Sequence, residues 1–420
     1  MPDRSDDAGP SMTPEGFGSL QGLRVIDLTQ MLAGPFATMI LADHGATVIK
    51  VEPPGGDMGR YQGMFREDDA DRTLSGYFQS IGRNKDSVVL DLKSEEGKAA
   101  FRALVRNADI VVESFRAGVM DRLGLSYESL REINPRLVYG SLRGFGDPRT
   151  GDSPYRDWPA FDVVAQAMGG IMAITGPDAQ TPMKIGPGIG DIIPGLFLLS
   201  GLLAAVISAR RTGRGQFVDV AMIDSIFAVC ERTVVQNSTM ALVPGPEGNH
   251  HPFLCPFGLY PTKDGPVAIA ATDNGFFATL CRALEVEELI EDERFASPQV
   301  RAVNRLALIA LLSARTASCS KAELVEWLGG KIPFGPVMNV ADQLADPHFA
   351  ARDMLAEIEQ PGSDPLRIVG VPIKMSETPG AVRRRSPLLG EHSALRLGEA
   401  GLSPSEIARL ANAAPTARKR

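Results

Sequence analysis

The sequence predicts an α/β protein with a large Rossmann-like domain on a parallel sheet and a smaller α+β domain. From Leu23 onward, short β-branched runs alternate with helical patterns, and near residue 225 the pattern changes. The 420 residues, 44% hydrophobic and 22% charged, are enough for about two or three domains with cores of their own. Strands that alternate with helices form parallel sheets, with ligands at the carboxyl ends of the strands.

The first βαβ unit begins at residue 23. LRVIDLT and ATVIKVE predict strands at 23–29 and 46–52. GPFATMILADHG between them predicts a helix at 34–45, with Pro35 near its first turn and Gly45 at its end.

A second unit repeats this pattern. Ser94 is the expected N-cap of its helix, SEEGKAAFRALVRNA. The elements expected from here to residue 142 are strands at 86–92, 109–115 and 136–142 and helices at 94–108, 118–124 and 126–134.

Asp191 stands alone among glycines, prolines and isoleucines in GPGIGDIIPG, ahead of the apolar run IIPGLFLLSGLLAAVIS. Aspartate is a preferred N-cap, so we expect Asp191 to cap a long helix with Pro194 in its first turn. The run is interrupted by proline, serine and glycine and falls short of the roughly 20 residues that a membrane span needs. A buried helix in a soluble core is expected. A carboxylate at a helix N-terminus between glycines also suits a nucleophile that substrate can approach closely.

The later sequence predicts a Gly-rich turn and a strand at 209–224, and a hairpin within 249–272. Helices are expected near 276–285 and 301–315, IPFGPVMNV marks the return toward the first domain, and RIVGVPIKM predicts one more strand. The expected divisions are a disordered tail at 1–20, the first part of the large domain at 21–224, the small domain at 225–340, a return to the large domain at 341–400 and a C-terminal tail at 401–420.

Charge and cysteine usage exclude several classes of protein. The net charge is −8, with no block of Lys or Arg, which argues against a nucleic-acid partner. The acidic N-terminus has the features of neither a signal peptide nor a transit peptide, so we expect a cytoplasmic protein without a membrane partner. The scattered cysteines predict neither a disulfide framework nor a metal site: Cys230, Cys255, Cys281 and Cys319.

The sequence lacks the common nucleotide and hydrolase motifs. It contains no G-x-G-x-x-G after the first strand and no G-x-x-x-x-G-K-[ST], which disfavours a dehydrogenase and an ATP-consuming ligase. It also contains no H-E-x-x-H and no G-x-S-x-G, which disfavours the common hydrolases.

Seven segments in order carry a resemblance to a known family. They are VIDLTQMLAGPFATMILADHGATVIKVEPPGGD, GRNKDSVVLDLKSEEGK, ADIVVESFRAGVMDRLGL, NPRLVYGSLRGFG, FDVVAQAMGGIMAITG, GPGIGDIIPG and RRTGRGQFVDVAMIDS. The chain resembles the class III CoA-transferase family, also called the CaiB/BaiF family, from about residue 21 to about residue 395.

The resemblance implies that Asp191 is a covalent nucleophile, with capping as a second role. Its carboxylate attacks the donor thioester to form a mixed aspartyl anhydride, and the released CoA thiolate returns to give an aspartyl-CoA thioester. The acceptor carboxylate then repeats the exchange. Covalent catalysis divides one difficult step into easier ones, and trading a thioester for a thioester needs no ATP.

The resemblance also implies where CoA, a substrate and product rather than a resident cofactor, would bind. Pantetheine would lie by Gln30, Leu32 and Ala33, and the adenine by Leu90 and Lys93. The site would be completed by Ser114 and Phe115 along the chain and by Arg122 at a phosphate. For Lys93 and Arg122 a solvated surface charge is the alternative, and for Phe115 ordinary core packing.

Departures from particular branches of the family narrow the function. Racemases carry a histidine where this chain has Phe161, and racemisation needs a base on each face of the carbon, so a racemase is disfavoured. Formyl-CoA transferases that use oxalate carry glutamine where this chain has Leu32 and tryptophan where it has Gln62, so a bulkier or more apolar acyl group is expected here.

Several polar residues remain open candidates. His250 and His251 line the acyl pocket or are structural loop histidines, and Arg116 and Arg143 are candidates for holding a distal carboxylate of a dicarboxylic acid. Lys184 is unassigned.

The resemblance further implies an obligate, intertwined homodimer. The expected function is transfer of CoA from an acyl-CoA to a carboxylic acid. The alternatives are an acyl-CoA isomerase (a racemase or an intramolecular CoA transferase), a non-catalytic CoA-binding homologue, and, at the level of fold, a Rossmann-type oxidoreductase.

Overall fold

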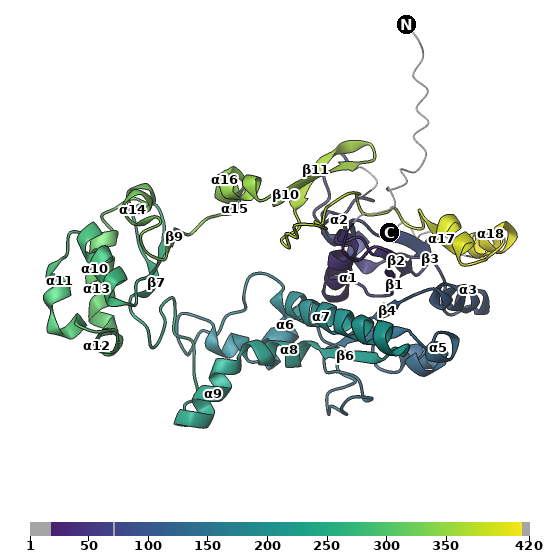
Figure 1. Cartoon of the computed structure of the whole chain (residues 1–420), viewed down its shortest axis with the longest axis horizontal. Coiled ribbons are helices and arrows are strands. Elements are labelled where there is room, and N and C mark those ends of the chain that lie inside the picture. Colours follow the sequence, from purple (N-terminus) through teal and green to yellow (C-terminus); the bar gives the residue numbers. More distant parts are fainter. Residues whose placement is uncertain (1–17, 70–71, 414–420) are drawn as a thin grey trace, which may run out of the picture. The chain divides into compact units, whose positions relative to one another are not determined.

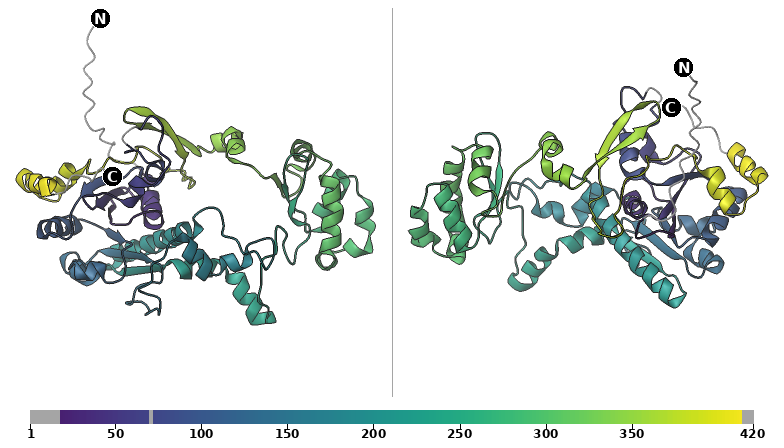
Figure 2. Two further views of the ribbon diagram at one scale, coloured as in Figure 1. Left: turned by 180° about the vertical axis from the view of Figure 1, so that it is seen from behind. Right: turned by 45° about the horizontal axis from the view of Figure 1, so that its top comes forward.

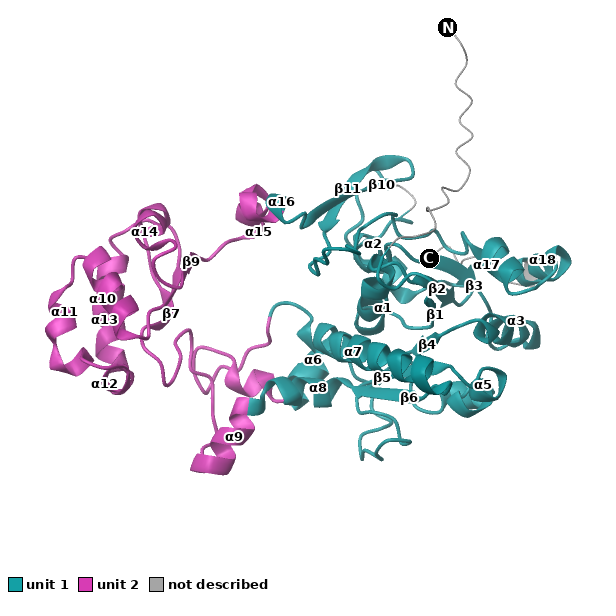
Figure 3. Cartoon of the chain, in the orientation of Figure 1, with its two compact units in different colours: residues 1–169, 186–231, 350–420 teal, residues 170–185, 232–349 magenta. Residues whose placement is uncertain are grey.

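A computed structural model of the chain describes residues 18–69 and 72–413 (Figures 1 and 2). The chain divides into two compact units (Figure 3). Unit 1 comprises residues 1–169, 186–231 and 350–420, and unit 2 comprises residues 170–185 and 232–349. Unit 1 is therefore assembled from three separate stretches of chain. The expected N-terminal tail lies, up to residue 17, outside the described residues.

A six-stranded, fully parallel sheet forms the centre of unit 1, which confirms the predicted α/β class. The strand order is β3-β2-β1-β4-β5-β6. Because the order reverses between β1 and β4, the loops that follow these two strands diverge and leave a crevice for a ligand. The strands are β1 (Arg24–Asp27), β2 (Thr47–Glu52), β3 (Asp86–Val89), β4 (Ile110–Glu113), β5 (Val138–Arg143) and β6 (Phe217–Ala221).

Helices cover this sheet as the alternating pattern predicts. Ser94 caps α3 by accepting a hydrogen bond from the Gly97 N–H at 3.0 Å, as expected. Phe101 and Leu104 of α3 pack with Ile26 and Val111 of the sheet in one buried cluster. The helices that follow the predicted pattern are α1 (Ala33–Asp43), α3 (Glu95–Arg106), α4 (Val119–Arg122) and α5 (Tyr127–Ile133).

The long helix α7 (Ile189–Thr212) begins earlier than the sequence predicts. Gly188 is its N-cap and Asp191 is its third residue, so the prediction that Asp191 caps the helix was wrong. The glycines at 188 and 190 allow the chain to enter the helix upstream of Asp191, and Pro194 consequently lies in the second turn.

By length and composition, α7 could cross a membrane. The helix has 24 residues and is longer than the apolar run IIPGLFLLSGLLAAVIS. Within unit 1 its side chains Leu198 and Leu202 are fully buried and face Gly140 of β5, where a Cβ would lie 2.8 Å from Leu202. This helix is thus packed directly on the sheet.

Unit 2 is built on a three-stranded antiparallel sheet. The predicted hairpin is β7 (Phe257–Tyr260) and β8 (Val267–Ala270), and β9 (Phe334–Pro336), from IPFGPVMNV, pairs with β8. Buried side chains of three helices complete its core: α10 (Asn274–Ala283), α13 (Arg305–Thr316) and α14 (Lys321–Leu328). The chain re-enters unit 1 at residue 350.

The C-terminal stretch adds a hairpin and two helices to unit 1. The strand predicted in RIVGVPIKM is part of β11 (Ser363–Val369), which pairs with β10 (Leu355–Gln360) and not with the main sheet. Residues 404–413, assigned to a tail from the sequence, form α18 (Pro404–Ala413) after α17 (Ser393–Glu399), because Ile407 and Leu410 pack against the core. Residues 414–420 lie outside the described part.

This stretch is tied to the sheet by ion pairs. The Asp86 carboxylate at the start of β3 is 1% exposed and lies 3.0 Å from Arg384 Nη1 and 2.6 Å from Arg396 Nη2. His392 Nε2 lies 3.3 Å from the same carboxylate. Two arginines from the end of the chain therefore neutralise one buried carboxylate near its beginning.

Candidate active site

Asp191 lies in the first turn of α7, and the two glycines before it, Gly188 and Gly190, lie against other segments of unit 1. The Gly190 N–H donates to Asp162 Oδ1 at 2.8 Å, and Asp162 is the first residue of α6 (Asp162–Met168). A Cβ built on Gly188 would lie 3.1 Å from Leu32 Cδ2. Glycines thus bring both segments against the backbone that carries Asp191.

Burial, and next the negative charge of Asp162, raise the pKa of Asp191 to about 7. A carboxylate with this pKa is more basic than an exposed one, and it is ionised above neutral pH. Because it is more basic, its ionised form is a stronger nucleophile than an exposed carboxylate.

Tyr77 lies close enough to sense the same charge. It belongs to α2 (Gly76–Gly82), and burial together with the charges of Asp191 and Asp57 raises its pKa to about 12. Its hydroxyl therefore stays protonated at neutral pH and can donate a hydrogen bond near Asp191.

The loops after β1 and β4 flank the crevice that the strand order predicts, and one hydrogen bond links them near the strand ends. The Gln30 N–H donates to Ser114 Oγ at 3.3 Å, joining the two loops. Ala33 begins α1 beside α7, where a Cβ on Gly195 would lie 2.5 Å from the Ala33 carbonyl oxygen. Gln30, Leu32, Ala33 and Ser114 are thus gathered next to the start of α7.

A buried ion network fixes the backbone of the first of these loops. Lys50 Nζ donates to the Thr29 carbonyl at 2.7 Å and lies 2.6 Å from Asp57 Oδ2, while Asp57 Oδ1 accepts from the Met31 N–H at 3.3 Å. Met31 has a φ of 65°, which a non-glycine residue adopts only where its surroundings enforce it. Beneath the loop, Lys85 Nζ lies 3.0 Å from Asp27 Oδ2, and both side chains are 0% exposed.

The remaining predicted CoA contacts differ in exposure. Lys93 and Arg122 are exposed and form no ion pair within residues 18–69 and 72–413, so both cations can reach an anionic ligand. Phe115 is half-buried against the core. Leu90 is 2% exposed and belongs to the core cluster, so its side chain packs inside the domain.

Arg143 cannot hold a substrate carboxylate. Its guanidinium donates to Glu113 Oε1 at 2.7 Å and to the Phe115 carbonyl at 2.9 Å, and it also pairs with Asp147. The side chain is 7% exposed. The prediction of a distal-carboxylate role for Arg143 was wrong, because its donors are already used; Arg116, by contrast, is exposed.

His250 and His251 belong to unit 2. The His250 ring packs edge-on against the Tyr260 ring, with 5.2 Å between the two ring centroids, and His251 Nε2 lies 3.2 Å from Arg232 Nη1. Burial lowers the pKa of both imidazoles, so they are neutral at pH 7.

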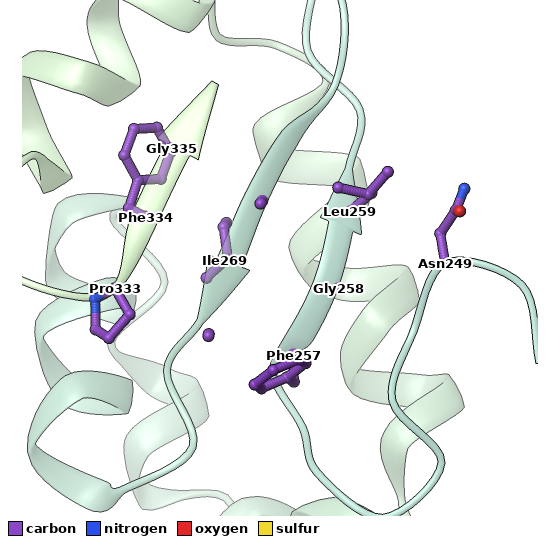
Figure 4. A pocket seen from close by; sticks show the side chains of 10 residues that line it. Asn249, Phe257, Gly258, Leu259, Ile269, Pro333, Phe334 and Gly335 are labelled. Atoms are coloured by element: carbon purple, nitrogen blue, oxygen red, sulfur yellow. The ribbon is translucent and has the colours of Figure 1, made fainter. Parts of the chain in front are cut away.

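A cavity of about 330 Å³ lies along the sheet of unit 2 (Figure 4). Its walls are the apolar side chains of Phe257, Leu259, Ile269 and Phe334, with strand backbone between them. It presents no titratable side chain, so no acid–base chemistry can take place on its walls.

Sequence reasoning missed three residues near Asp191: Tyr77, Asp162 and Gln166. Gln166 Nε2 donates to both Asp162 oxygens, at 2.9 and 3.0 Å. The i, i+4 spacing of Asp162 and Gln166 in FDVVAQA was the available signal, since it places both side chains on one face of a helix. No local pattern marks Tyr77.

Within the described residues, no three His, Cys, Asp or Glu side chains are grouped as a metal site requires.

Comparison with known proteins identifies the family. The family model described as CoA-transferase family III matches residues 20–393. The chain is 47% identical to a succinyl-CoA:mesaconate CoA-transferase of Haloarcula hispanica, over 92% of this chain and 97% of that one. It is 39% identical to a succinate–glutarate CoA-transferase of Agrobacterium fabrum, over 90% and 95% of the two chains.

A solved structure shares the fold. The crystal structure of a CaiB/BaiF family protein from Brucella suis superposes with a TM-score of 0.81 at 38% identity, covering 92% of this chain and all of that one. These likenesses confirm the resemblance seen in the sequence. The chain belongs to CoA-transferase family III and is a CoA-transferase.

Proposed function

We propose that this enzyme moves CoA from succinyl-CoA or a similar acyl-CoA to a dicarboxylic acid of four or five carbons, with Asp191 as the nucleophile. The observation that carries the proposal is the half-buried Asp191 carboxylate, basic and framed by glycines, at the start of α7. The relatives described above are named for succinate, mesaconate and glutarate, all dicarboxylic acids. Leu32 beside the nucleophile favours such acids over the smaller oxalate.

The exchange balances without water or ATP. An Asp191 oxygen attacks the thioester carbon, the C–S bond breaks, and CoA leaves as thiolate, which produces a mixed anhydride. The thiolate attacks the aspartyl carbonyl of this anhydride, the C–O bond breaks, and the donor acid leaves, which produces an aspartyl-CoA thioester. The acceptor carboxylate attacks that thioester, and the freed thiolate then takes the acceptor acyl group, which restores Asp191. The Tyr77 hydroxyl supplies a hydrogen-bond donor beside these intermediates.

In this proposal unit 1 is the CoA-binding domain, and CoA lies across the crevice between β1 and β4. Gln30, Leu32 and Ala33 hold the thiol end, while Ser114 and Phe115 line the pantetheine path. The adenine and the phosphates are held by Lys93 and Arg122, over a floor that Leu90 supports from the core.

We also propose a cytoplasmic homodimer. Apolar side chains on α7 and α8 (Met222–Val229) remain 43% to 70% exposed: Leu196, Phe197, Ile207, Phe227 and Val229. A second chain would cover such surface. Sedimentation equilibrium at micromolar concentration tests this, and a monomer there contradicts it.

Trapping of the acyl-enzyme tests the proposed function. The enzyme is incubated with succinyl-CoA, glutaryl-CoA or acetyl-CoA plus hydroxylamine, and peptides are analysed by mass spectrometry. We expect a donor-dependent hydroxamate on Asp191 and, without hydroxylamine, CoA transfer to mesaconate or glutarate. Absence of any Asp191 adduct although CoA binds would favour a binding protein. Rearrangement of one acyl-CoA without an acceptor would favour an isomerase.

Substitution of Gly190 by alanine is expected to lower kcat by about 100-fold, because misplacement of a reacting group by about 1 Å has that effect. The added Cβ would lie 2.4 Å from the Asp162 carbonyl oxygen, so the first turn of α7 must shift. The rate of CoA transfer at saturating substrate is the measurement. Gly186→Ala is the matched control, since a Cβ there meets no atom within 4 Å. Equal activity of the two variants would show that the close approach is unnecessary.

A further inference from the structure

Asp162 is held more rigidly than a surface carboxylate at a helix start. Its two oxygens accept from Gln166 Nε2 at 2.9 and 3.0 Å, and Oδ1 also accepts from the Gly190 N–H at 2.8 Å. Gln166 is 0% exposed, so this amide cannot leave to solvent. The carboxylate is therefore clamped between its own helix and the peptide that precedes Asp191.

We propose that Asp162 is a positioning residue for the nucleophile: it fixes the Gly190 amide and holds a negative charge beside Asp191. The hydrogen bond to the Gly190 amide sets the orientation of the Asp191 carboxylate, and the negative charge of Asp162 sets its basicity. The inference rests on the proposed function, because it assigns Asp162 a role in the reaction of Asp191.

Two observations support the double role. Gly190 leaves no space for movement, since a Cβ there would lie 2.9 Å from Asp162 Oδ1. After burial, the negative charge of Asp162 is the cause that raises the pKa of Asp191. The other titratable or charged groups on elements packed around α7, or near its first turn, are Asp43 on α1, Tyr139 and Arg143 on β5, Asp219 on β6, Asp224 on α8, Tyr77 on α2 and Asp57.

Asp162→Asn separates the charge from the geometry. Asparagine Oδ1 still accepts from the Gly190 N–H, and a flipped Gln166 amide can accept from its Nδ2, so both contacts persist while the charge is lost. Wild-type kcat/KM, which reports the free enzyme, is expected to rise through pH 7 as Asp191 ionises. In Asp162→Asn we expect this acid limb about one pH unit lower, since removal of a like charge favours the ionised form.

Asp162→Ala removes both the charge and the contact. We expect the same shift of the acid limb and, in addition, a loss of about 100-fold in the high-pH plateau from misplacement of the carboxylate. If both variants keep the wild-type acid limb, the charge has no role. If Asp162→Ala keeps the wild-type plateau, the contact has no positioning role. Should Asp162→Ala fail to fold, as shown by circular dichroism, the pH profile of Asp162→Asn still tests the charge.

A second readout does not depend on turnover. The carboxyl ¹³C resonance of Asp191, assigned as the one lost in Asp191→Asn, is titrated in the substrate-free enzyme. A titration at lower pH in Asp162→Asn supports the inference, and an unchanged one overturns it. The proposed function fails separately, by absence of an Asp191 adduct in the wild type.

Discussion

Asp191→Asn is expected to lower kcat for CoA transfer by at least about 10⁴-fold, the scale seen when a covalent nucleophile is removed. The amide cannot form the anhydride or the aspartyl-CoA thioester, so neither half of the exchange can occur. Asparagine has nearly the same shape, and the helix cap is Gly188, so the substitution removes no capping contact. The measurement is the steady-state rate with succinyl-CoA and mesaconate.

Two controls show that the loss is chemical. CoA affinity measured by calorimetry should stay within about threefold, because no proposed CoA contact is changed. The variant should also unfold at a higher temperature than the wild type at pH 8 and at an equal one at pH 4. The raised pKa of Asp191 means that the wild-type fold loses stability as pH rises from about 4 to about 7. Transfer at more than one per cent of the wild-type rate would contradict the nucleophile role.

Lys85→Met is expected to lower the free energy of unfolding by about 3–5 kcal/mol, because it leaves a buried carboxylate without its partner. Lys85 Nζ lies 3.0 Å from Asp27 Oδ2, 2.7 Å from Thr38 Oγ1 and 2.9 Å from the Pro35 carbonyl. Neither charged side chain is exposed. Denaturant unfolding followed by circular dichroism measures the change.

Lys98→Met is the matched control. Lys98 pairs at 2.8 Å with Glu95, whose side chain is 80% exposed, and such surface pairs contribute about 0–1 kcal/mol. If the two lysine substitutions lower stability equally, the buried pair is not a special source of stability.

The CoA affinity of Lys85→Met should also fall, since Asp27 Oδ1 holds the Thr29 N–H at 2.9 Å in the loop beneath the proposed CoA site.

The parallel sheet and its crevice could be predicted from local patterns. Alternation of strands and helices fixes a doubly covered sheet, and the loops at Gln30 and Ser114 follow strands that the sequence marks clearly. The assignment of Asp191 as the nucleophile, which we propose, came from the resemblance. Local chemistry alone favoured a helix cap, which was wrong because the glycines at 188 and 190 let the helix begin earlier.

What the sequence could not show depends on contacts between distant segments. Arg143 resembles a free cation until its partner Glu113, thirty residues earlier, is placed beside it by the pairing of β4 with β5. Tyr77 and Asp162 reach Asp191 from separate helices, and no spacing within either segment encodes that meeting. Sequence patterns report periodicity within an element, whereas the site is built between elements.

The ion pairs at Asp86 have a consequence for synthesis on the ribosome. The partners Arg384 and Arg396 follow Asp86 by 298 and 310 residues. At about 5–20 residues per second, roughly 15 to 60 seconds pass before they emerge. During that interval β3 carries an unpaired carboxylate, and residues 232–349 of unit 2 are synthesised before either arginine appears. The nascent enzyme therefore finishes unit 2 first, and unit 1, which contains Asp191, is complete only when translation is nearly over.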